Sequence, residues 1–432
     1  MSAGTGPVED AACAVLIVGA GPTGLLLAAL LARRGVDVRV LERRAAPPVH
    51  SRAIGLHPPA LRALAEIGSA REAVALGERV RIGRARARGR ALGGVDFARG
   101  RALAPFVLTL PQSRTEDLLV QRLAALAPSA LQRGWEVTDL QEAAGAVTVT
   151  ARRSGADPGL LRLRADLVVG ADGSRSRVRS LLGIPADGRD PSDMYLMGDL
   201  ADPAGAEDER EAHIHLESGG VVESFPLPGG QRRWVVHTGT VGRDPTAALL
   251  VALVRERTGT VLDPATATMI SAFAVRRRAA RRLLSRRCVL LGDAAHEISP
   301  IGGQGITLGW LDALDLAPLI EHALALRRPP ALREDPAWRR VERRIRRRTR
   351  CAGALATLNT VLGRPAPGPL SELRALTVRL VLGTSLRDRM AWVYSMGWAA
   401  RSMRRDSRGG GLRRHVRRAG GAEGLWGRIG WR

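Results

Sequence analysis

Six residues near the start of the chain restrict its fold more than any other feature. Gly19-Ala20-Gly21-Pro22-Thr23-Gly24 places three glycines in the pattern GxGxxG. The pattern follows an apolar run, Ala14–Val18, and precedes a stretch of Leu and Ala, Leu25–Arg34, that ends at a glycine. An aliphatic run, a glycine turn and an apolar helix are typical of a βαβ unit, so we expect a second parallel strand at Val36–Leu41.

Each glycine of this turn has an expected role. Gly19 allows the tight turn, Gly21 lets the backbone approach a pyrophosphate, and Gly24 lets the helix pack closely against the strand. The pyrophosphate would lie at the start of the helix, where free N–H groups and the helix dipole favour negative charge. Glu42 ends the second strand, where an acid is expected to bond the ribose of an adenosine without a 2′-phosphate, and Arg43 is a further candidate contact. The alternative is a glycine-rich turn that binds nothing.

The charge of the chain does not by itself indicate a nucleic-acid partner. The formal net charge is +24, and the chain has 66 Lys and Arg, every one of them arginine. The uniform use of arginine in an Ala-rich chain favours biased genome composition acting on surface positions. We therefore predict no nucleic-acid partner, and a basic protein that binds nucleic acid or acidic lipid stays the remote alternative.

The cysteines and the N-terminus bear on the cellular compartment. Cys13, Cys288 and Cys351 are far apart and fit no metal-ligand spacing, so we predict no metal site, with Cys13 and Cys288 as small buried residues. The start, Met1–Ala12, lacks the pattern of a signal peptide, and glycines interrupt the apolar region Cys13–Ala32 too often for a membrane span. The expectation is a cytoplasmic protein.

Two later segments repeat the arrangement of a strand followed by glycine and an acid. They are Leu167–Arg179 (LVVGADGSRSRVR) and Cys288–His296 (CVLLGDAAH). Together with the N-terminal turn they resemble, in order and spacing, the three fingerprints of aromatic-ring flavoprotein monooxygenases of the p-hydroxybenzoate hydroxylase fold. The resemblance spans roughly Ala14–Leu324 and implies that the dinucleotide is FAD.

The resemblance and the pattern of the chain together predict an α/β fold. From about Pro185 short alternating runs joined by Gly and Pro turns indicate a second region rich in strands. We expect a Rossmann-like FAD-binding domain with an inserted sheet-rich substrate domain and C-terminal helices. The expected boundaries are 1–80, 100–184 and 276–365 for the FAD-binding domain, 81–99 and 185–275 for the substrate domain, 366–405 for the helical region and 406–432 for a basic flexible tail.

The resemblance also assigns roles at the cofactor site. Asp293 would accept hydrogen bonds from the ribityl hydroxyls of FAD; a helix N-cap is its alternative role. The loop Pro300–Gly305 would lie against the isoalloxazine ring, and the first N–H groups of the following helix would stabilise negative charge there. The predicted cofactor contacts are Gly19, Gly21, Pro22, Thr23, Gly24, Glu42, Arg43, Arg52, Gln112, Asp172, Gly292, Asp293, Gly303, Gln304, Gly305, Ile306 and Thr307, and the predicted catalytic loop residues are Pro300, Gly302 and Gly303.

Some of these assignments have ordinary structural alternatives. Arg52 could be a surface arginine, Gln112 could cap a helix, and Asp172 is expected to act behind the residues that touch the cofactor. Thr307 stands where the family usually has asparagine, which leaves one flavin contact in doubt. The absence of a Trp-x-Trp-x-x-Pro segment speaks against flavin halogenases, which share this architecture.

The implied reaction is hydroxylation of a phenol with NAD(P)H and O2. In this family NAD(P)H reduces the flavin, O2 adds to give a C4a-hydroperoxide, and its distal oxygen is transferred to an electron-rich ring; the protein excludes water and places the substrate. The run from Glu297–Ile301 through Gly309–Asp312, together with Glu223–Pro228, resembles bacterial flavoprotein hydroxylases of phenolic polyketides or alkylresorcinol-type lipids. The alternative is an FAD-dependent reductase or oxidase of a prenyl or polyketide substrate.

The sequence does not identify a catalytic base. His213 and His215 would share one face of a strand, and a solvent-facing position is favoured for both. His296 lies inside the third fingerprint and is expected to be structural. Further candidates of equal standing are Tyr195, Glu223 and His237. The Arg-rich helix expected over Leu386–Arg405 could touch an anionic membrane, although an ordinary packing helix is favoured.

Overall fold

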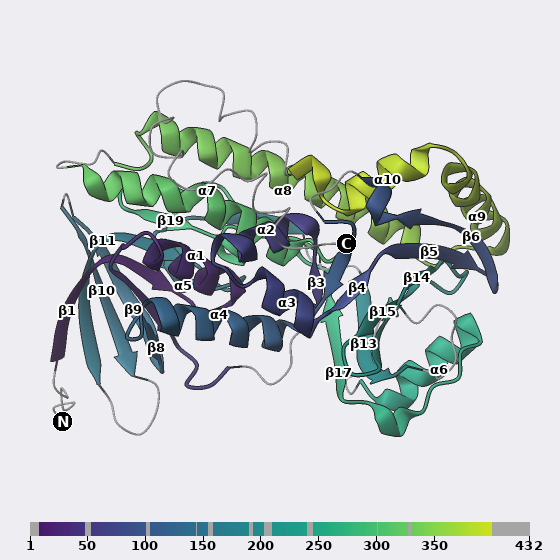
Figure 1. The fold of residues 1–432 in the computed structure, drawn as a ribbon. Coiled ribbons are helices and arrows are strands. Elements are labelled where there is room, and N and C mark those ends of the chain that lie inside the picture. Colours follow the sequence, from purple (N-terminus) through teal and green to yellow (C-terminus); the bar gives the residue numbers. More distant parts are fainter. Residues whose placement is uncertain are drawn as a thin grey trace.

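The computed structural model describes residues 8–47, 53–100, 104–143, 145–153, 159–189, 193–202, 210–239, 245–299, 301–326 and 331–399. Two large sheets form two lobes, and long helices extend from the first lobe toward the second (Figure 1). The predicted fold class is confirmed: an α/β lobe opens the chain, a sheet-rich lobe is inserted into it, and helices end the described part.

The first sheet is mostly parallel and contains the predicted βαβ unit. Strands β8, β2, β1, β11 and β19 run parallel, while β9 and β10 add an antiparallel hairpin beside β11. In spatial order the strands are β8 (Leu131–Arg133), β2 (Val38–Glu42), β1 (Val8–Val18), β11 (Leu160–Gly170), β10 (Val147–Arg153) and β9 (Trp135–Glu142), with β19 (Cys288–Leu290) paired to the end of β11.

The parallel strands of this sheet end together. Val18 pairs with Gly170 on one side and with Leu41 on the other, and Gly170 pairs in turn with Leu290. The three glycine-acid segments therefore meet at one carboxyl edge, which is where open α/β sheets bind ligands.

Helices cover both faces of the first sheet. The first helix is apolar all round because it is buried between the sheet and its neighbours α4 and α7. It ends at Ala32, two residues before the predicted end. The helices of this lobe are α1 (Pro22–Ala32), α2 (Pro58–Glu66), α3 (Ala70–Leu76), α4 (Gln112–Leu126), α5 (Arg177–Leu181), α7 (Gly305–Ala325) and α8 (Pro336–Gly363).

The second sheet is antiparallel except where β14 and β5 pair in parallel. Helix α6 (Ala247–Thr258), which the sequence analysis did not anticipate, covers one face: its Leu250 and Val254 pack against Trp234 and Val236. In spatial order the strands are β17 (Met269–Ala274), β13 (Met194–Ala201), β16 (Gln231–His237), β15 (Val222–Leu227), β14 (Ala212–His215), β5 (Ile82–Ala87) and β6 (Arg90–Asp96).

Short elements join the two lobes and end the described chain. One small sheet contains β3 (Gly55–Leu56), β7 (Val107–Thr109) and β4 (Glu78–Val80). A second small sheet contains β12 (Ala186–Arg189), β18 (Arg277–Ala280) and β20 (His296–Glu297). Three 3-10 turns are η1 (Phe97–Gly100), η2 (Pro264–Thr266) and η3 (Gly292–Ala294), and the last helices are α9 (Gly368–Gly383) and α10 (Leu386–Tyr394). Both last helices contact β6 of the second sheet.

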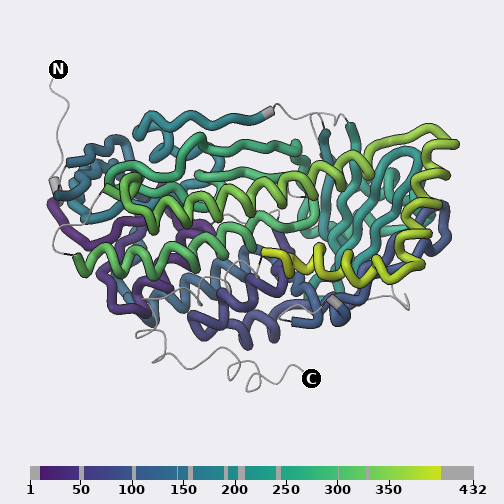
Figure 2. Tube along the Cα trace, turned by 90° about the horizontal axis from the view of Figure 1, so that it is seen from above, coloured from purple at the N-terminus to yellow at the C-terminus, as the bar shows by residue number. Residues whose placement is uncertain are grey.

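An ion cluster joins α7 to α8, which run side by side in Figures 1 and 2. Arg348, only 3% exposed, donates to Asp312 at 2.8 Å and to Asp315 at 2.6 Å. Asp312 also accepts from Nε2 of His296 at 2.5 Å, which confirms a structural role for that histidine. The expectation that the arginines occupy surface positions is therefore wrong at Arg348, because its place on α8 directs it toward the buried carboxylates of Asp312 and Asp315.

No described helix is both long and apolar enough to span a bilayer.

Candidate active site

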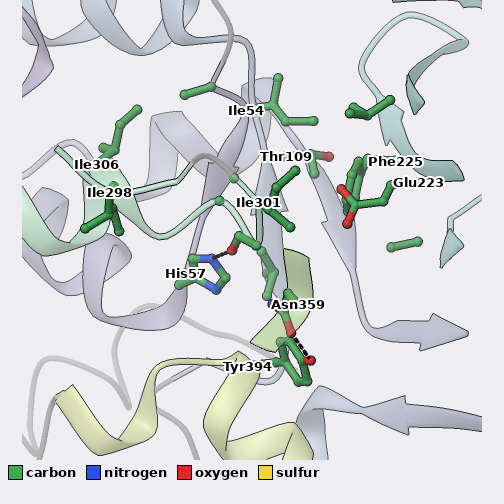
Figure 3. Close-up of a pocket in the computed structure, with 18 of the residues that line it drawn as sticks. Ile54, His57, Thr109, Glu223, Phe225, Ile298, Ile301, Ile306, Asn359 and Tyr394 are labelled. Atoms are coloured by element: carbon green, nitrogen blue, oxygen red, sulfur yellow. Dashed lines mark hydrogen bonds between the residues drawn. The ribbon is translucent and has the colours of Figure 1, made fainter. Parts of the chain in front are cut away.

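A cavity of about 710 Å³ joins the carboxyl edge of the first sheet to the inner face of the second. On the first side it is bordered by the glycine turn, through Gly21, Pro22 and Thr23, and by the loop before α7, through Gly302 and Gly303. On the other side its walls are strands of the second sheet and the C-terminal helices (Figure 3). Cofactor and substrate candidates therefore share one space.

The glycine turn has the geometry expected of a pyrophosphate site. Gly19 has a φ of 107°, and a Cβ on Gly24 would lie 2.1 Å from the Gly19 carbonyl oxygen, so neither position accepts a side chain. A Cβ on Gly21 would meet nothing within 4 Å and would point into open space. Helix α1 begins here with no side-chain cap, which leaves its first N–H groups available to an anion.

Glu42 is 5% exposed and fixes this turn from behind the cavity wall. Its Oε2 accepts from the N–H of Ala20 at 2.9 Å, and its Oε1 accepts from the N–H and Nε of Arg44 at 3.0 and 2.9 Å. Burial raises the pKa of Glu42, but the hydrogen bonds from Arg44 and Ala20 outweigh it and lower the pKa overall. Arg44 lines the cavity, whereas the predicted contact Arg43 is exposed and outside it.

Asp293 presents an acceptor to the cavity. Its carboxylate lines the space, and no described residue donates a hydrogen bond to it. Because protein surrounds it on its other sides, burial raises its pKa to about 6. The N-cap of the short helix η3 is Leu291, so Asp293 does not have the alternative capping role. A carboxylate that faces the cavity and has no donor among the described residues fits the hydroxyls of a sugar alcohol chain such as the ribityl group.

The turn that carries Asp293 packs on the glycine turn. Gly292 has a φ of 62°, and a Cβ there would lie 3.2 Å from Oγ1 of Thr23. A Cβ on Gly309, in the second turn of α7, would lie 2.6 Å from the same oxygen. These two glycines let α1, η3 and α7 approach one another, which brings the first and third motifs to the same cavity.

Asp172 acts from behind the cavity wall, as expected. Its carboxylate accepts from Ser176 Oγ at 2.5 Å and from the N–H groups of Arg177 and Val178 at 2.6 and 3.0 Å, which caps α5. The neighbouring Gly173 lines the cavity. The conformation of the second motif is therefore set by a capping carboxylate.

Gln112 lines the cavity at the start of α4. Its Nε2 donates to Glu116 Oε1 at 2.7 Å, and the N-cap of the helix is Pro111, so Gln112 does not cap α4.

The loop before α7 is held by a histidine that the sequence analysis missed. Gly302 and Gly303 have φ of 90° and 65°, and Nε2 of His57 donates to the Gly302 carbonyl at 3.0 Å. Burial lowers the pKa of His57 to about 4, so the ring is neutral at pH 7. The main-chain N–H of His57 donates to Oγ1 of Thr307 at 3.4 Å, which gives the threonine a structural contact.

Helix α7 also begins at the cavity without a side-chain cap, and its first residues Gly305 and Ile306 line the space. Oε1 of Gln304, the N-cap residue, is buried and has no partner among the described residues. Two uncapped helix starts and the Asp293 carboxylate, which has no donor among the described residues, thus border one cavity. This arrangement fits a molecule that carries both a diphosphate and hydroxyl groups, as FAD does. The predicted residues Pro300 and Arg52 lie outside the described residues.

The other end of the cavity is a mostly apolar chamber. Its C-terminal wall was not anticipated: Asn359 of α8 accepts a hydrogen bond from Tyr394 of α10 at 2.8 Å (Figure 3). The sequence gives no signal for this wall beyond the apolar spacing of helices α9 and α10. Apolar lining residues are Val95, Phe97, Met197, Ile214, Leu216, Val221, Phe225, Val235, Phe273, Ile301, Leu362, Val378, Leu382 and Met390.

The two histidines of β14 do not face this chamber. Their rings lie on one face of the strand with centroids 6.1 Å apart, as predicted, but Ile214 between them lines the cavity instead. His215 is only 8% exposed, so its expected solvent-facing position is wrong. The strand is in the interior of the second sheet, between β5 and β15, and this is not evident from its own residues.

The remaining candidates for the catalytic base, His237, Tyr195 and Glu223, differ in whether they line the cavity. Nε2 of His237 is bonded to Asp193 at 3.1 Å, and Tyr195 is buried between the rings of His237 and Phe273. Glu223 lines the chamber. Of the three, only Glu223 is among the residues that line the cavity.

Comparison with known proteins agrees with this geometry. The chain is 36% identical over 380 residues to 6-methylpretetramide 4-monooxygenase of Streptomyces rimosus, a match that covers 86% of this chain and 67% of that protein. The chain spans 60–67% of the length of the first five curated relatives that it matches.

Two solved structures have the same fold. The p-nitrophenol 4-monooxygenase of Pseudomonas putida DLL-E4 superposes with a TM-score of 0.77 at 22% identity and covers 89% of this chain and 98% of its own. An aromatic hydroxylase from angucycline biosynthesis superposes with a TM-score of 0.70 at 25% identity and covers 89% of this chain and 76% of its own.

The family model for the FAD binding domain matches residues 12–335. That range contains all three motifs and more than half of the chain, and the prediction of FAD from those motifs is confirmed. The chain belongs to the FAD-binding domain family.

Proposed function

We propose that this protein is an FAD-dependent monooxygenase that hydroxylates a phenolic substrate with NAD(P)H and O2. The observation that carries the proposal is the single cavity in which the three FAD motifs open directly into an apolar chamber. The monooxygenase activity in the name of the Streptomyces relative supports it. Because the chain spans only part of the length of such relatives, their activity is a proposal for this chain.

We assign the cofactor to the carboxyl edge of the first sheet. The starts of α1 and α7 would receive its negatively charged groups, and Asp293 would accept from its hydroxyls. Bound FAD supplies the redox chemistry that NAD(P)H and O2 require. With a single dinucleotide motif in the sequence, we propose that the nicotinamide binds transiently and has no Rossmann domain of its own.

The residues of the chain position the substrate and the flavin loop, and they exclude water from the site. Apolar walls from the second sheet and from α9 and α10 surround the substrate end, which keeps water from competing for the activated oxygen. His57 holds the Gly302–Gly303 loop in its left-handed conformation, so the N–H groups at the start of α7 are oriented before anything binds.

We propose a division of labour between the two lobes that follows the boundaries expected from the sequence. Regions 1–80, 100–184 and 276–365 would hold the cofactor, and 81–99 and 185–275 would hold the substrate. The helical region 366–405 would take part in the substrate site as well, because Val378, Leu382 and Tyr394 line the chamber. An apolar chamber of this kind suits a phenolic polyketide or an alkylresorcinol-type lipid.

The test is reconstitution and isotope labelling. The purified protein with FAD should show a flavin spectrum, and phenolic polyketides, beginning with 6-methylpretetramide, should stimulate NAD(P)H oxidation. With ¹⁸O2 the product should carry one labelled oxygen. Release of hydrogen peroxide without a labelled product, or reduction of a substrate double bond, would instead show the oxidase or reductase alternative.

We also propose that the protein is cytoplasmic and makes a weak contact with anionic membranes through its C-terminal region. Helix α10 packs against β6 and η1, as favoured for an ordinary helix, but α9 exposes Leu370, Leu373, Leu376 and Leu380 along one side. Leucines beside a net charge of +24 favour an anionic lipid surface. Cosedimentation with phosphatidylglycerol vesicles, but not phosphatidylcholine vesicles, is expected, and Leu373→Gln with Leu380→Gln should abolish it.

A further inference from the structure

An acidic residue occupies a position of β15 where the strand pattern calls for an apolar one. Glu223 and Phe225 of this strand line the chamber, as does Val221 just before it, while Ser224 faces the other way and contacts Arg232. The register places Glu223 between Ile214 of β14 and Val235 of β16, both apolar. The carboxylate therefore interrupts an otherwise apolar wall.

No described residue satisfies this carboxylate. Glu223 is 8% exposed, yet none of the described residues forms a hydrogen bond or ion pair with it. Burial raises the pKa of Glu223 to about 7. A buried carboxyl without a partner is costly to the folded protein, so its presence favours a ligand that supplies the donor.

Two arginines that line the chamber are paired within the protein. Arg233 of β16 donates to Asp199 at 2.6 and 2.7 Å, and Arg84 of β5 donates to Glu211 at 2.7 Å. Their positive charges are thus balanced by other carboxylates and do not neutralise Glu223.

The titratable groups that face Glu223 are tyrosines. Burial raises the pKa of Tyr195 on β13 and of Tyr394 on α10, and the charge of Glu223 raises both further, so that the pKa of Tyr394 reaches about 12. Both rings are therefore neutral over the range in which Glu223 titrates. The hydroxyl of Tyr394 donates to Asn359, so it is not directed at the carboxylate. In Figure 3 the carboxylate oxygens of Glu223 point toward the loop that carries Ile301.

We propose that the Glu223 carboxylate accepts a hydrogen bond from a ring hydroxyl of the substrate and takes up its proton during turnover. The inference rests on the proposed function and names a residue for it. The phenolic O–H bond breaks, the proton forms a new O–H bond on Glu223, and the electron pair stays on the phenol oxygen, where it enriches the ring for attack by an electrophilic oxygen. Solvent takes up the proton when product leaves.

The test compares two ligands that differ in whether the oxygen on the ring carries a hydrogen or a methyl group. With the FAD-bound protein, binding of 1-naphthol and of 1-methoxynaphthalene is titrated through the change in flavin absorbance, which needs no turnover. Wild type is expected to bind the naphthol at least tenfold more tightly than the ether, with the preference growing between pH 6 and pH 8 as the carboxyl ionises. Glu223→Leu should lose the preference and its pH dependence.

Two further variants separate the roles of this residue. Glu223→Gln still accepts a hydrogen bond, so it should keep part of the preference at every pH but lose at least tenfold in kcat with any accepted phenol. Ser224→Ala, on the opposite face of the same strand, should match wild type. Flavin content and thermal unfolding check that each variant is folded.

The outcomes distinguish this inference from the proposed function. If Glu223→Leu retains FAD and discriminates between the two ligands as wild type does, or if wild type binds neither or both equally, the inference is wrong. If wild type shows the predicted discrimination but incorporates no oxygen from O2, the proposed reaction fails while the hydroxyl contact stands.

Discussion

The main-chain N–H of Ala20 donates to Oε2 of Glu42 at 2.9 Å, which ties the glycine turn to the end of the neighbouring strand β2. Removing this acceptor by Glu42→Ala leaves the Ala20 N–H and the Arg44 side chain without their partner. We expect the free energy of unfolding to fall by about 2 kcal/mol and FAD affinity to fall at least tenfold. Denaturant unfolding and FAD titration measure these, with the exposed Glu136→Ala as the control that should change neither.

The same carboxylate should make stability depend on pH at the acid end. Because folding lowers the pKa of Glu42 below its ordinary 4.5, its stabilising contribution is complete above that pH and is lost as the pH falls. The difference in unfolding free energy between wild type and Glu42→Gln is therefore expected to shrink when measurements move from pH 6 to pH 3. A difference that grew toward low pH would contradict this account.

The second and third glycines of the N-terminal turn, Gly21 and Gly24, should respond to alanine in different ways. A Cβ on Gly24 would lie 2.1 Å from a backbone oxygen, so Gly24→Ala should destabilise the protein by about 3 kcal/mol or more. A Cβ on Gly21 meets nothing within 4 Å, so Gly21→Ala should leave the apoprotein within about 1 kcal/mol of wild type but weaken FAD binding at least tenfold. Thermal unfolding of the apoproteins and flavin titration separate the two effects.

Asp293→Asn should change stability and cofactor affinity in opposite directions. The pKa of Asp293 is raised from 3.8 to about 6, so above pH 6 the folded apoprotein carries a charge that burial disfavours. The amide variant escapes this cost, and its apoprotein should melt at a higher temperature than wild type at pH 7.5 but not at pH 4. Its FAD affinity should be lower because an amide oxygen is a weaker acceptor than a carboxylate. Equal melting temperatures at both pH values would argue against a carboxylate enclosed by protein.

The buried Arg348 should contribute more to the free energy of unfolding than its exposed neighbour Arg347. Arg348→Met leaves the carboxylates of Asp312 and Asp315 without this cation, so we expect a loss of about 3 to 5 kcal/mol of unfolding free energy. Arg347→Met removes the same charge from the surface and should cost less than about 0.5 kcal/mol. Urea denaturation of the two variants side by side tests this, and equal losses would show that α8 is not anchored through Arg348.

The local patterns of the sequence were sufficient to predict the strands and helices that carry the cofactor motifs. The strands β1, β11 and β19 were expected from short aliphatic runs that end at glycine, and β2 was expected from the run Val36–Leu41. Such runs are informative because a buried parallel strand needs apolar side chains on both faces. Helix α6 was missed, since its apolar residues are recognisable as a packing face only against the sheet that they cover.

The residues at the substrate end could not be predicted from the sequence, because contacts between distant parts of the chain bring them together. His57 and Thr307 are 250 residues apart in the sequence but form a hydrogen bond, and Tyr394 of α10 donates a hydrogen bond to Asn359 of α8. Glu223 was one of several equal candidates until the register of β15 placed it on the chamber wall. A single sequence contains no signal for such pairs, because each residue satisfies its local pattern equally well on either face of its strand or helix.

By itself the sequence determined the βαβ opening, the glycine turn and the FAD family, because glycine at a positive φ and apolar runs before it are requirements of local backbone geometry. Only the tertiary structure decided that α1 and α7 begin at one cavity, that Arg44 borders it in place of Arg43, and that Glu223 faces it without a partner among the described residues. The physical reason is that burial and hydrogen bonding are set by what the rest of the chain brings alongside a residue, and this depends on how the sheets and helices pack.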